Sequence, residues 1–146
     1  MDILSLFVVV PVITILVLIF SKNLKQSRVI AAVGMLVQFA MSLNLIFAYY
    51  KEKQVNDSIM VFTKDFLWFE KFNIHYTIGV DGISVAMIVL ASIVVLAGVF
   101  ISWKMEDLHK EFFISLIVLA TGVFGFFISI DLFTMFLFYE IAVIPM

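Results

Sequence analysis

The chain has 146 residues, of which 64% are hydrophobic, with a mean hydropathy of +1.20 and a formal net charge of −2. A water-soluble globular domain of this size is excluded, because such a domain cannot keep so much apolar surface away from water. The absence of cysteine excludes disulfides, thiolate zinc sites and iron–sulfur clusters held by this chain. No nucleic-acid partner is expected.

Charged residues divide the sequence into uncharged runs of 19 to 22 residues, at 3–21, 29–50, 82–103 and 112–130. Each run is long enough to cross the hydrocarbon core of a bilayer, about 30 Å, as a helix. No ten-residue segments of alternating polarity indicate a membrane barrel. We therefore predict an all-α polytopic membrane protein, a single membrane domain over residues 1–146. Its expected helices are four complete spans and the start of a fifth, at about 3–20, 29–50, 82–103, 112–130 and 132–146.

The first two spans contain polar residues that a helix bundle must accommodate. Pro11 lies in the middle of the first span, and neighbouring helices are expected to satisfy the carbonyl group that it leaves free. In the second span, Gln38, Ser42 and Asn44 are expected to form hydrogen bonds between helices.

The connectors predict the topology of the chain. The segment 21–28 carries Lys22, Lys25 and Arg28 and no acid, so the positive-inside rule places it in the cytoplasm and the N-terminus outside. The loop 51–81 is then external. Within this loop, residues 74–80 alternate in polarity as a short strand does, which indicates a small strand or hairpin on the outer surface.

The later spans begin at acidic residues and contain paired glycines. Asp81 and Asp131 each precede an apolar run, and both are predicted to be N-caps rather than proton-relay groups. Gly122 and Gly125 would let a neighbouring helix approach the fourth span closely. The fifth span has only 15 residues after Asp131, fewer than the roughly 20 that a crossing needs. We therefore expect the chain to be the first part of a longer protein.

Glu140 is the strongest candidate for a functional residue. It lies nine residues after Asp131, which is about 13 Å along a helix and therefore near the middle of a bilayer. Burial in lipid disfavours the ionised carboxylate, and a group that gains and loses a proton inside the membrane is what a proton relay requires. No lysine or arginine shares its helical face, which carries Phe133, Phe136, Leu137, Val143 and Ile144. The alternative is a permanently protonated or structurally paired glutamate.

Two further features allow more than one interpretation. Pro145 cannot donate to the carbonyl of Ile141, so this acceptor one turn past Glu140 is free for water or a side chain, or the proline only kinks the helix. His75 and His109 are expected on opposite sides of the membrane, where they cannot share a metal. No phosphate-binding loop or nucleophile motif is present, and no metal site is predicted.

Several segments resemble the antiporter-like, proton-translocating subunits of respiratory complex I. They are Asp81-Gly82-Ile83-Ser84, Ser102-Trp103-Lys104, Ile130-Asp131-Leu132-Phe133 and Phe138-Tyr139-Glu140-Ile141 with Ile144-Pro145-Met146. The ending is most similar to the subunit M family of NADH-quinone oxidoreductases. The resemblance implies about fourteen spans in the whole subunit, a proton-handling role for Glu140, and lysine partners on later helices.

The resemblance also implies a location and partners. These are the bacterial inner membrane, its lipid bilayer, and the other membrane subunits of the complex, especially neighbouring antiporter-like subunits. No cofactor is implied in this chain, because FMN, iron–sulfur clusters, NADH and quinone are handled by other subunits. Two alternatives stay open: a subunit of a multisubunit sodium/proton antiporter, and an inactive structural membrane fragment in which Glu140 only ties helices together.

Overall fold

The computed structural model describes residues 3–55, 59–69, 74–105 and 109–146. Four long helices form the body of the protein: α1 (Ile3–Phe20), α2 (Leu24–Val55), α3 (Gly82–Ile101) and α4 (Lys110–Ile128). A fifth helix, α5 (Leu132–Val143), follows at once. The first four helices are long and apolar enough to cross a membrane, which confirms the predicted fold class, an all-α polytopic membrane protein.

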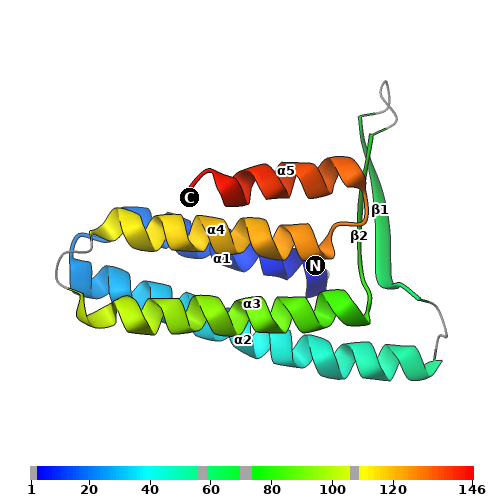
Figure 1. The fold of residues 1–146 in the computed structure, drawn as a ribbon, viewed down its shortest axis with the longest axis horizontal. Coiled ribbons are helices and arrows are strands. Elements are labelled where there is room, and N and C mark those ends of the chain that lie inside the picture. Colours follow the sequence, from blue (N-terminus) through cyan, green and yellow to red (C-terminus); the bar gives the residue numbers. More distant parts are fainter. Residues whose placement is uncertain (1–2, 56–58, 70–73, 106–108) are drawn as a thin grey trace.

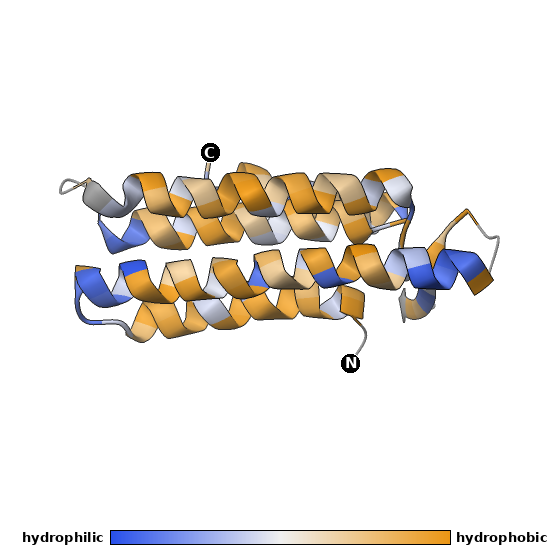
Figure 2. Ribbon diagram, turned by 90° about the horizontal axis from the view of Figure 1, so that it is seen from below, coloured by the Kyte–Doolittle hydropathy of each residue, from blue (hydrophilic) through white to orange (hydrophobic). Residues whose placement is uncertain are grey.

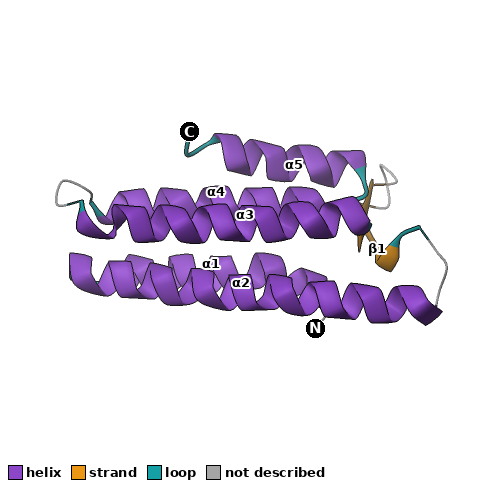
Figure 3. Ribbon diagram, turned by 60° about the horizontal axis from the view of Figure 1, so that its bottom comes forward, coloured by secondary structure: helices purple, strands orange, loops and turns teal. Residues whose placement is uncertain are grey.

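The helices α1 to α4 form a ring in which each helix packs on the next and α4 returns to α1. Neighbouring helices of the ring run in opposite directions (Figure 1). Helix α5 lies outside this ring and packs on α4, with a smaller contact to the strands at one end (Figures 1 and 3). Hydrophilic residues gather at the two ends of the bundle, and the helices between them are mainly hydrophobic (Figure 2).

The helices do not end where the apolar runs end. Helix α2 extends past the predicted span 29–50 at both ends, because lysine, arginine, glutamate and glutamine are good helix formers that continue a helix into water. Helix α3 stops at Ile101 and a 3₁₀ turn, Ser102–Lys104, follows. Helix α4 ends two residues before the predicted boundary, and α5 ends at Val143.

The connector between α2 and α3 contains the expected hairpin, formed by β1 (Val61–Phe69) and β2 (Ile74–Val80). The strands are antiparallel, with Asp65 opposite Thr77 and Phe66 opposite Tyr76. The register shifts between Val61 and Lys64, and Phe62 in this bulge has a positive φ of 59°. A bulge bends its strand, so β1 is bent near its first residue.

Buried polar residues link the helices of the ring. Pro11 has no N–H group for the Phe7 carbonyl, and the side-chain amide of Gln38 donates to this carbonyl at 3.1 Å. The hydroxyl groups of Ser42 and Ser92 lie 2.9 Å apart between α2 and α3. These contacts confirm the predicted hydrogen bonds between helices for Gln38 and Ser42. The prediction is wrong for Asn44, an exposed residue whose amide donates to Ala40 in its own helix.

Candidate functional site on the fifth helix

The start of α5 is fixed by the second strand of the hairpin. The backbone N–H of Ile130 donates to the Thr77 carbonyl at 2.9 Å, and Ser129 forms a bridge with Ile78. The Ser129 hydroxyl donates to the Gly125 carbonyl at 2.6 Å, in the last turn of α4. Because backbone pairing ends α4 and redirects the chain, the α4–α5 turn has a defined geometry rather than that of an open loop.

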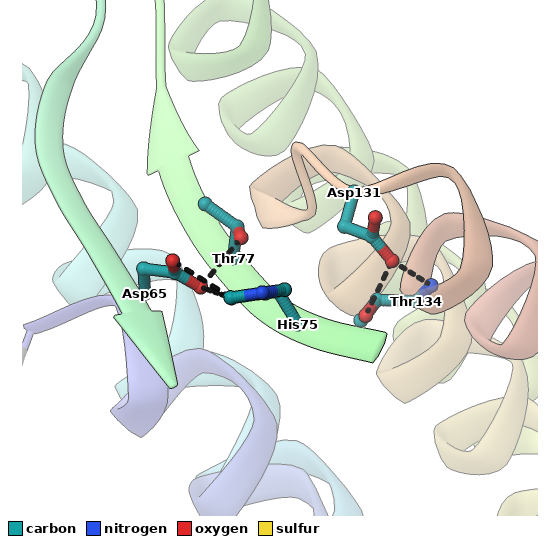
Figure 4. Close-up of polar contacts among 5 residues, drawn as sticks. All are labelled: Asp65, His75, Thr77, Asp131 and Thr134. Atoms are coloured by element: carbon teal, nitrogen blue, oxygen red, sulfur yellow. Dashed lines mark hydrogen bonds and ion pairs between the residues drawn. The ribbon is translucent and has the colours of Figure 1, made fainter. Parts of the chain in front are cut away.

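Asp131 is the N-cap of α5. One carboxylate oxygen accepts the backbone N–H groups of Phe133 at 3.0 Å and Thr134 at 3.2 Å, and the Thr134 hydroxyl lies 3.5 Å away (Figure 4). These N–H groups belong to the first turn, where a helix offers no carbonyl partner of its own. The predicted N-cap geometry is present, and a relay role for Asp131 stays a prediction.

A second polar group lies on the hairpin beside Asp131 (Figure 4). The carboxylate of Asp65 lies 2.9 Å from His75 Nδ1 and accepts the hydroxyl of Thr77 at 3.0 Å. The sequence predicts no partner for His75, and it does not indicate a role for Asp65 or Thr77. The alternation along the predicted strand 74–80 is the one available signal, since His75 and Thr77 lie on the same face of a strand.

Asp81 caps α3 at the same end of the bundle. Its carboxylate accepts the backbone N–H of Ser84 at 2.7 Å, as predicted for an N-cap. This hydrogen bond, with one from the Ser84 side chain, lowers the pKa of the Asp81 carboxyl below its ordinary value, because both stabilise the ionised form. Strand β2 therefore leads into one capped helix, α3, and holds the start of the other, α5.

The inner face of α5 packs closely on the two glycines of α4. A Cβ atom added at Gly122 would lie 2.6 Å from the backbone nitrogen of Ala142, and one added at Gly125 would lie 2.2 Å from the Phe138 ring. Thr134 and Phe138 are the buried residues of α5. The predicted role of Gly122 and Gly125 in close helix approach is confirmed.

Glu140 lies on the opposite, outer face of α5. It follows Phe138 by two residues, which is about 200° around the helix, and its side chain is exposed. Its neighbours on this face are exposed as well, Phe133 by 44%, Phe136 by 60% and Ile144 by 78%. Among the residues that the structure describes, no hydrogen bond or ion pair involves the Glu140 carboxylate. The ring of α1 to α4 leaves this face uncovered.

Two grooves follow the sides of α5. One of about 680 Å³ is lined by α5 residues from Asp131 to Tyr139 together with Phe126. The other, about 350 Å³, lies between α5 and the hairpin and is lined in part by Phe66 and Tyr76. Burial raises the pKa of the Tyr76 phenol. The first groove includes Phe133 and Phe136 of the outer face, and Glu140 is not among the lining residues of either groove.

The remaining predicted residues lie apart from this region. Pro145 comes two residues after the last residue of α5, and its role in freeing the Ile141 carbonyl stays a prediction. His75 lies in β2 and His109 at the start of α4, at opposite ends of the bundle (Figure 1). Within the described ranges, no three histidine or acidic side chains come together as metal ligands.

Similar proteins identify the family. No protein-family model matches this chain. NADH-quinone oxidoreductase subunit M of Buchnera aphidicola subsp. Baizongia pistaciae is 35% identical over 127 residues, which cover 85% of this chain and 25% of that protein. The Rhodobacter capsulatus protein of the same name is 30% identical, over 84% of this chain and 23% of that protein. F(420)H(2) dehydrogenase subunit M of Methanosarcina mazei is 27% identical, over 97% of this chain and 28% of that protein.

The fold is also found in one chain of a known membrane complex. A chain of the membrane-bound sulfane sulfur reductase, an archaeal respiratory membrane complex, superposes with a TM-score of 0.68 at 16% identity. The match covers 97% of this chain and 28% of that chain. This chain thus spans about a quarter of the length of the proteins it matches. The sequence matches place it in the subunit M family of respiratory NADH-quinone oxidoreductases.

Proposed function

We propose that this chain is part of a proton-translocating membrane subunit of a respiratory NADH:quinone oxidoreductase, in which Glu140 carries the proton. Two observations support the proposal. The relatives described above are named as subunits of respiratory oxidoreductases. Glu140 is also the only charged residue inside the apolar parts of the five helices.

The position of Glu140 suits a group that changes its protonation state. An ionisable residue inside a bilayer is costly and is by default a functional hypothesis. A purely structural glutamate would be expected to pair within the bundle, as Gln38 and Ser42 do. Glu140 instead points away from the ring on a helix whose own start is rigidly held. A fixed helix with an open carboxylate allows a charged partner to approach and withdraw without unfolding the bundle.

In the proposed mechanism, Glu140 binds a proton when no positive charge is near, because lipid disfavours the carboxylate. The approach of a lysine from a later helix favours the ionised form, and the proton leaves. Quinone reduction in other subunits would drive this change through a row of intramembrane charges. The electron carriers, NADH, FMN, iron–sulfur clusters and quinone, would all be bound by other subunits, and the chain would lie in a bacterial inner membrane with its N-terminus outside.

The experiment that tests this proposal replaces Glu140 by glutamine in the complete subunit. Glutamine keeps the size and hydrogen bonding of the side chain but cannot carry the proton. NADH oxidation and proton uptake are followed together in inverted membrane vesicles, after immunoblotting shows that the complex assembles. We expect Glu140→Gln to lower proton uptake at least tenfold in an intact complex, with Glu140→Asp retaining part of it.

The matched control is Glu52→Gln, which removes the same charge from the projecting end of α2 and should leave proton uptake unchanged. Normal NADH oxidation and proton uptake in Glu140→Gln would show that the glutamate is not in the relay. Loss of assembly in both Glu140→Gln and Glu140→Asp would assign it a structural role. Sodium-dependent transport without NADH would support the antiporter alternative, which the oxidoreductase names of these relatives do not favour.

A further inference from the structure

The α1–α2 connector and the start of α4 lie at the end of the bundle opposite the hairpin (Figure 1). Residues of both segments line a polar pocket there. Its volume is about 370 Å³. The polar residues that line it include Lys22, Asn23, Ser27, His109, Lys110 and Glu111. The pocket lies at the level where the helices leave the apolar part of the membrane, because the uncharged run of α1 ends at Ser21.

Hydrogen bonds hold the walls of this pocket in place. The Lys110 ammonium donates to the carbonyl groups of Ile19 at 3.1 Å and Ser21 at 3.3 Å, which ties α4 to the end of α1. The hydroxyl groups of Ser21 and Ser27 lie 2.7 Å apart. An ammonium group has three N–H donors, so Lys110 keeps one donor in addition to these two contacts. Lys22 is exposed at the rim.

The charge at this end of the molecule is positive. Residues 21–28 and 104–111 together contain five lysines and arginines and three acids. The basic residues are Lys22, Lys25, Arg28, Lys104 and Lys110, and the acids are Glu106, Asp107 and Glu111. Glu106 and Asp107 lie outside the described residues. Among the residues that line the pocket, Lys22 and Lys110 outnumber Glu111, so the pocket favours an anion.

An apolar groove of about 390 Å³ runs along the same pair of helices. Its lining includes Val10, Thr14 and Val17 of α1 and Ile30, Gly34 and Val37 of α2. The one hydroxyl group in this lining, that of Thr14, donates to the Val10 carbonyl at 2.9 Å. A Cβ atom added at Gly34 would lie 2.5 Å from Thr14, so the two helices approach each other closely along the groove.

The groove and the pocket follow each other along α1 and α2. Val17 of the groove precedes Ser21 of the pocket by four residues, and Ile30 follows Ser27 by three. Residues at these spacings are neighbours on one face of a helix, about 5–6 Å apart. The apolar groove between α1 and α2 therefore begins about one helical turn from the basic pocket.

We propose that the pocket and the groove together bind one anionic glycerophospholipid, with its phosphate between Lys22 and Lys110 and one acyl chain along the α1–α2 groove. The proposal needs no proton chemistry and is independent of the proposed function. Basic pockets between helices on the cytoplasmic side of membrane proteins bind anionic head groups. A zwitterionic lipid carries a positive amine that the two lysines repel, and free phosphate makes no use of the groove.

The test compares lipid binding by variants of the complete protein, purified in mild detergent. Native mass spectrometry measures the apparent Kd for phosphatidylglycerol and for phosphatidylcholine. Lys22→Gln is compared with Lys25→Gln, which removes the same charge from the same segment outside the pocket lining. We expect Lys22→Gln to weaken phosphatidylglycerol binding about fivefold, the effect of losing one lysine near the surface, and Lys25→Gln to change it less than twofold.

A second pair of variants tests the groove. Val33→Phe places a ring in the groove and should weaken phosphatidylglycerol binding, whereas Val12→Phe on the exposed side of α1 should not. Equal affinities for phosphatidylglycerol and phosphatidylcholine would overturn the proposal, as would equal losses in Lys22→Gln and Lys25→Gln. Competition by millimolar inorganic phosphate with no effect of Val33→Phe would show a simple anion site, which also overturns it.

Discussion

Helices α1 to α4 and helix α5 are stabilised in different ways. Each helix of the ring packs on at least two others, and polar side chains such as Gln38 and Ser42 are fully buried and bonded across helices. Helix α5 packs on α4 along one face, and Asp131 and the backbone of β2 fix its start. Its outer face has no cover within the described residues, and the only charged residue within the apolar spans, Glu140, lies there.

This comparison separates two uses of polar groups in a membrane. In the ring, Gln38 donates to the carbonyl that Pro11 leaves free and Ser42 joins two helices, and both side chains are neutral, so their burial costs far less than that of a charge. On α5, an ionisable group is presented by a helix that is anchored at one end and along one face. In order of decreasing expected effect, substitutions can disrupt the packing of α5 on α4, the hydrogen bond from Gln38 in the ring and the Asp131 cap of α5.

The largest expected effect comes from the inner face of α5. Gly122→Ala places a methyl group against the backbone of Ala142, which cannot rotate away as a side chain can. We expect it to lower the free energy of unfolding in detergent by about 3 kcal/mol, the upper part of the range for overpacking. Disulfide crosslinking between cysteines introduced on α4 and α5 should show that α5 has moved from α4.

Gly98→Ala is the matched control for this change. A Cβ atom at Gly98 would lie 3.9 Å from Leu116, an ordinary contact, so the better helix propensity of alanine should leave the protein equally stable or up to about 1 kcal/mol more stable. If the two alanine variants had the same stability, tight packing of α4 on α5 would not be what holds the fifth helix.

The next largest effect concerns the hydrogen bond from Gln38 to the Phe7 carbonyl, which Pro11 leaves without a backbone donor. Gln38→Met leaves the Phe7 carbonyl without its donor and should lower the free energy of unfolding by about 2 kcal/mol, as expected for an unpaired buried acceptor. Combining it with Pro11→Ala should reduce this cost to below about 1 kcal/mol, because the alanine introduced by that change has a backbone N–H that can donate to the Phe7 carbonyl. Purely additive effects in this double-mutant cycle would show that Gln38 stabilises the ring by packing alone.

Composition and helix-forming residues predict much of this fold. Contacts between segments that are distant in the sequence could not be predicted. The four uncharged runs locate α1 to α4, and Asp131 locates the start of α5. The glycine pair predicts a close helix contact on α4 without naming its partner, because this signal lies within one helix. The partner of Gln38 could not be predicted, since Phe7 is on another helix 31 residues away. The pairing of Ile130 with Thr77 and the contact of Asp65 with His75 also depend on how distant segments dock. Glu140 points outward because α4 packs on the opposite face of α5, and the sequence alone does not show which face α4 covers.

The smallest expected effect is at Asp131, where two variants distinguish helix capping from proton transfer. Asp131→Ala removes the acceptor of two backbone N–H groups and should cost about 1 kcal/mol of unfolding free energy. Asp131→Asn keeps an oxygen acceptor but cannot carry a proton, so a residue that only caps α5 should tolerate it. We therefore expect Asp131→Asn to keep the thermal stability within a few degrees and the proton uptake of inverted vesicles unchanged. Normal stability with abolished proton uptake in this variant would instead make Asp131 a relay group at the mouth of the path to Glu140.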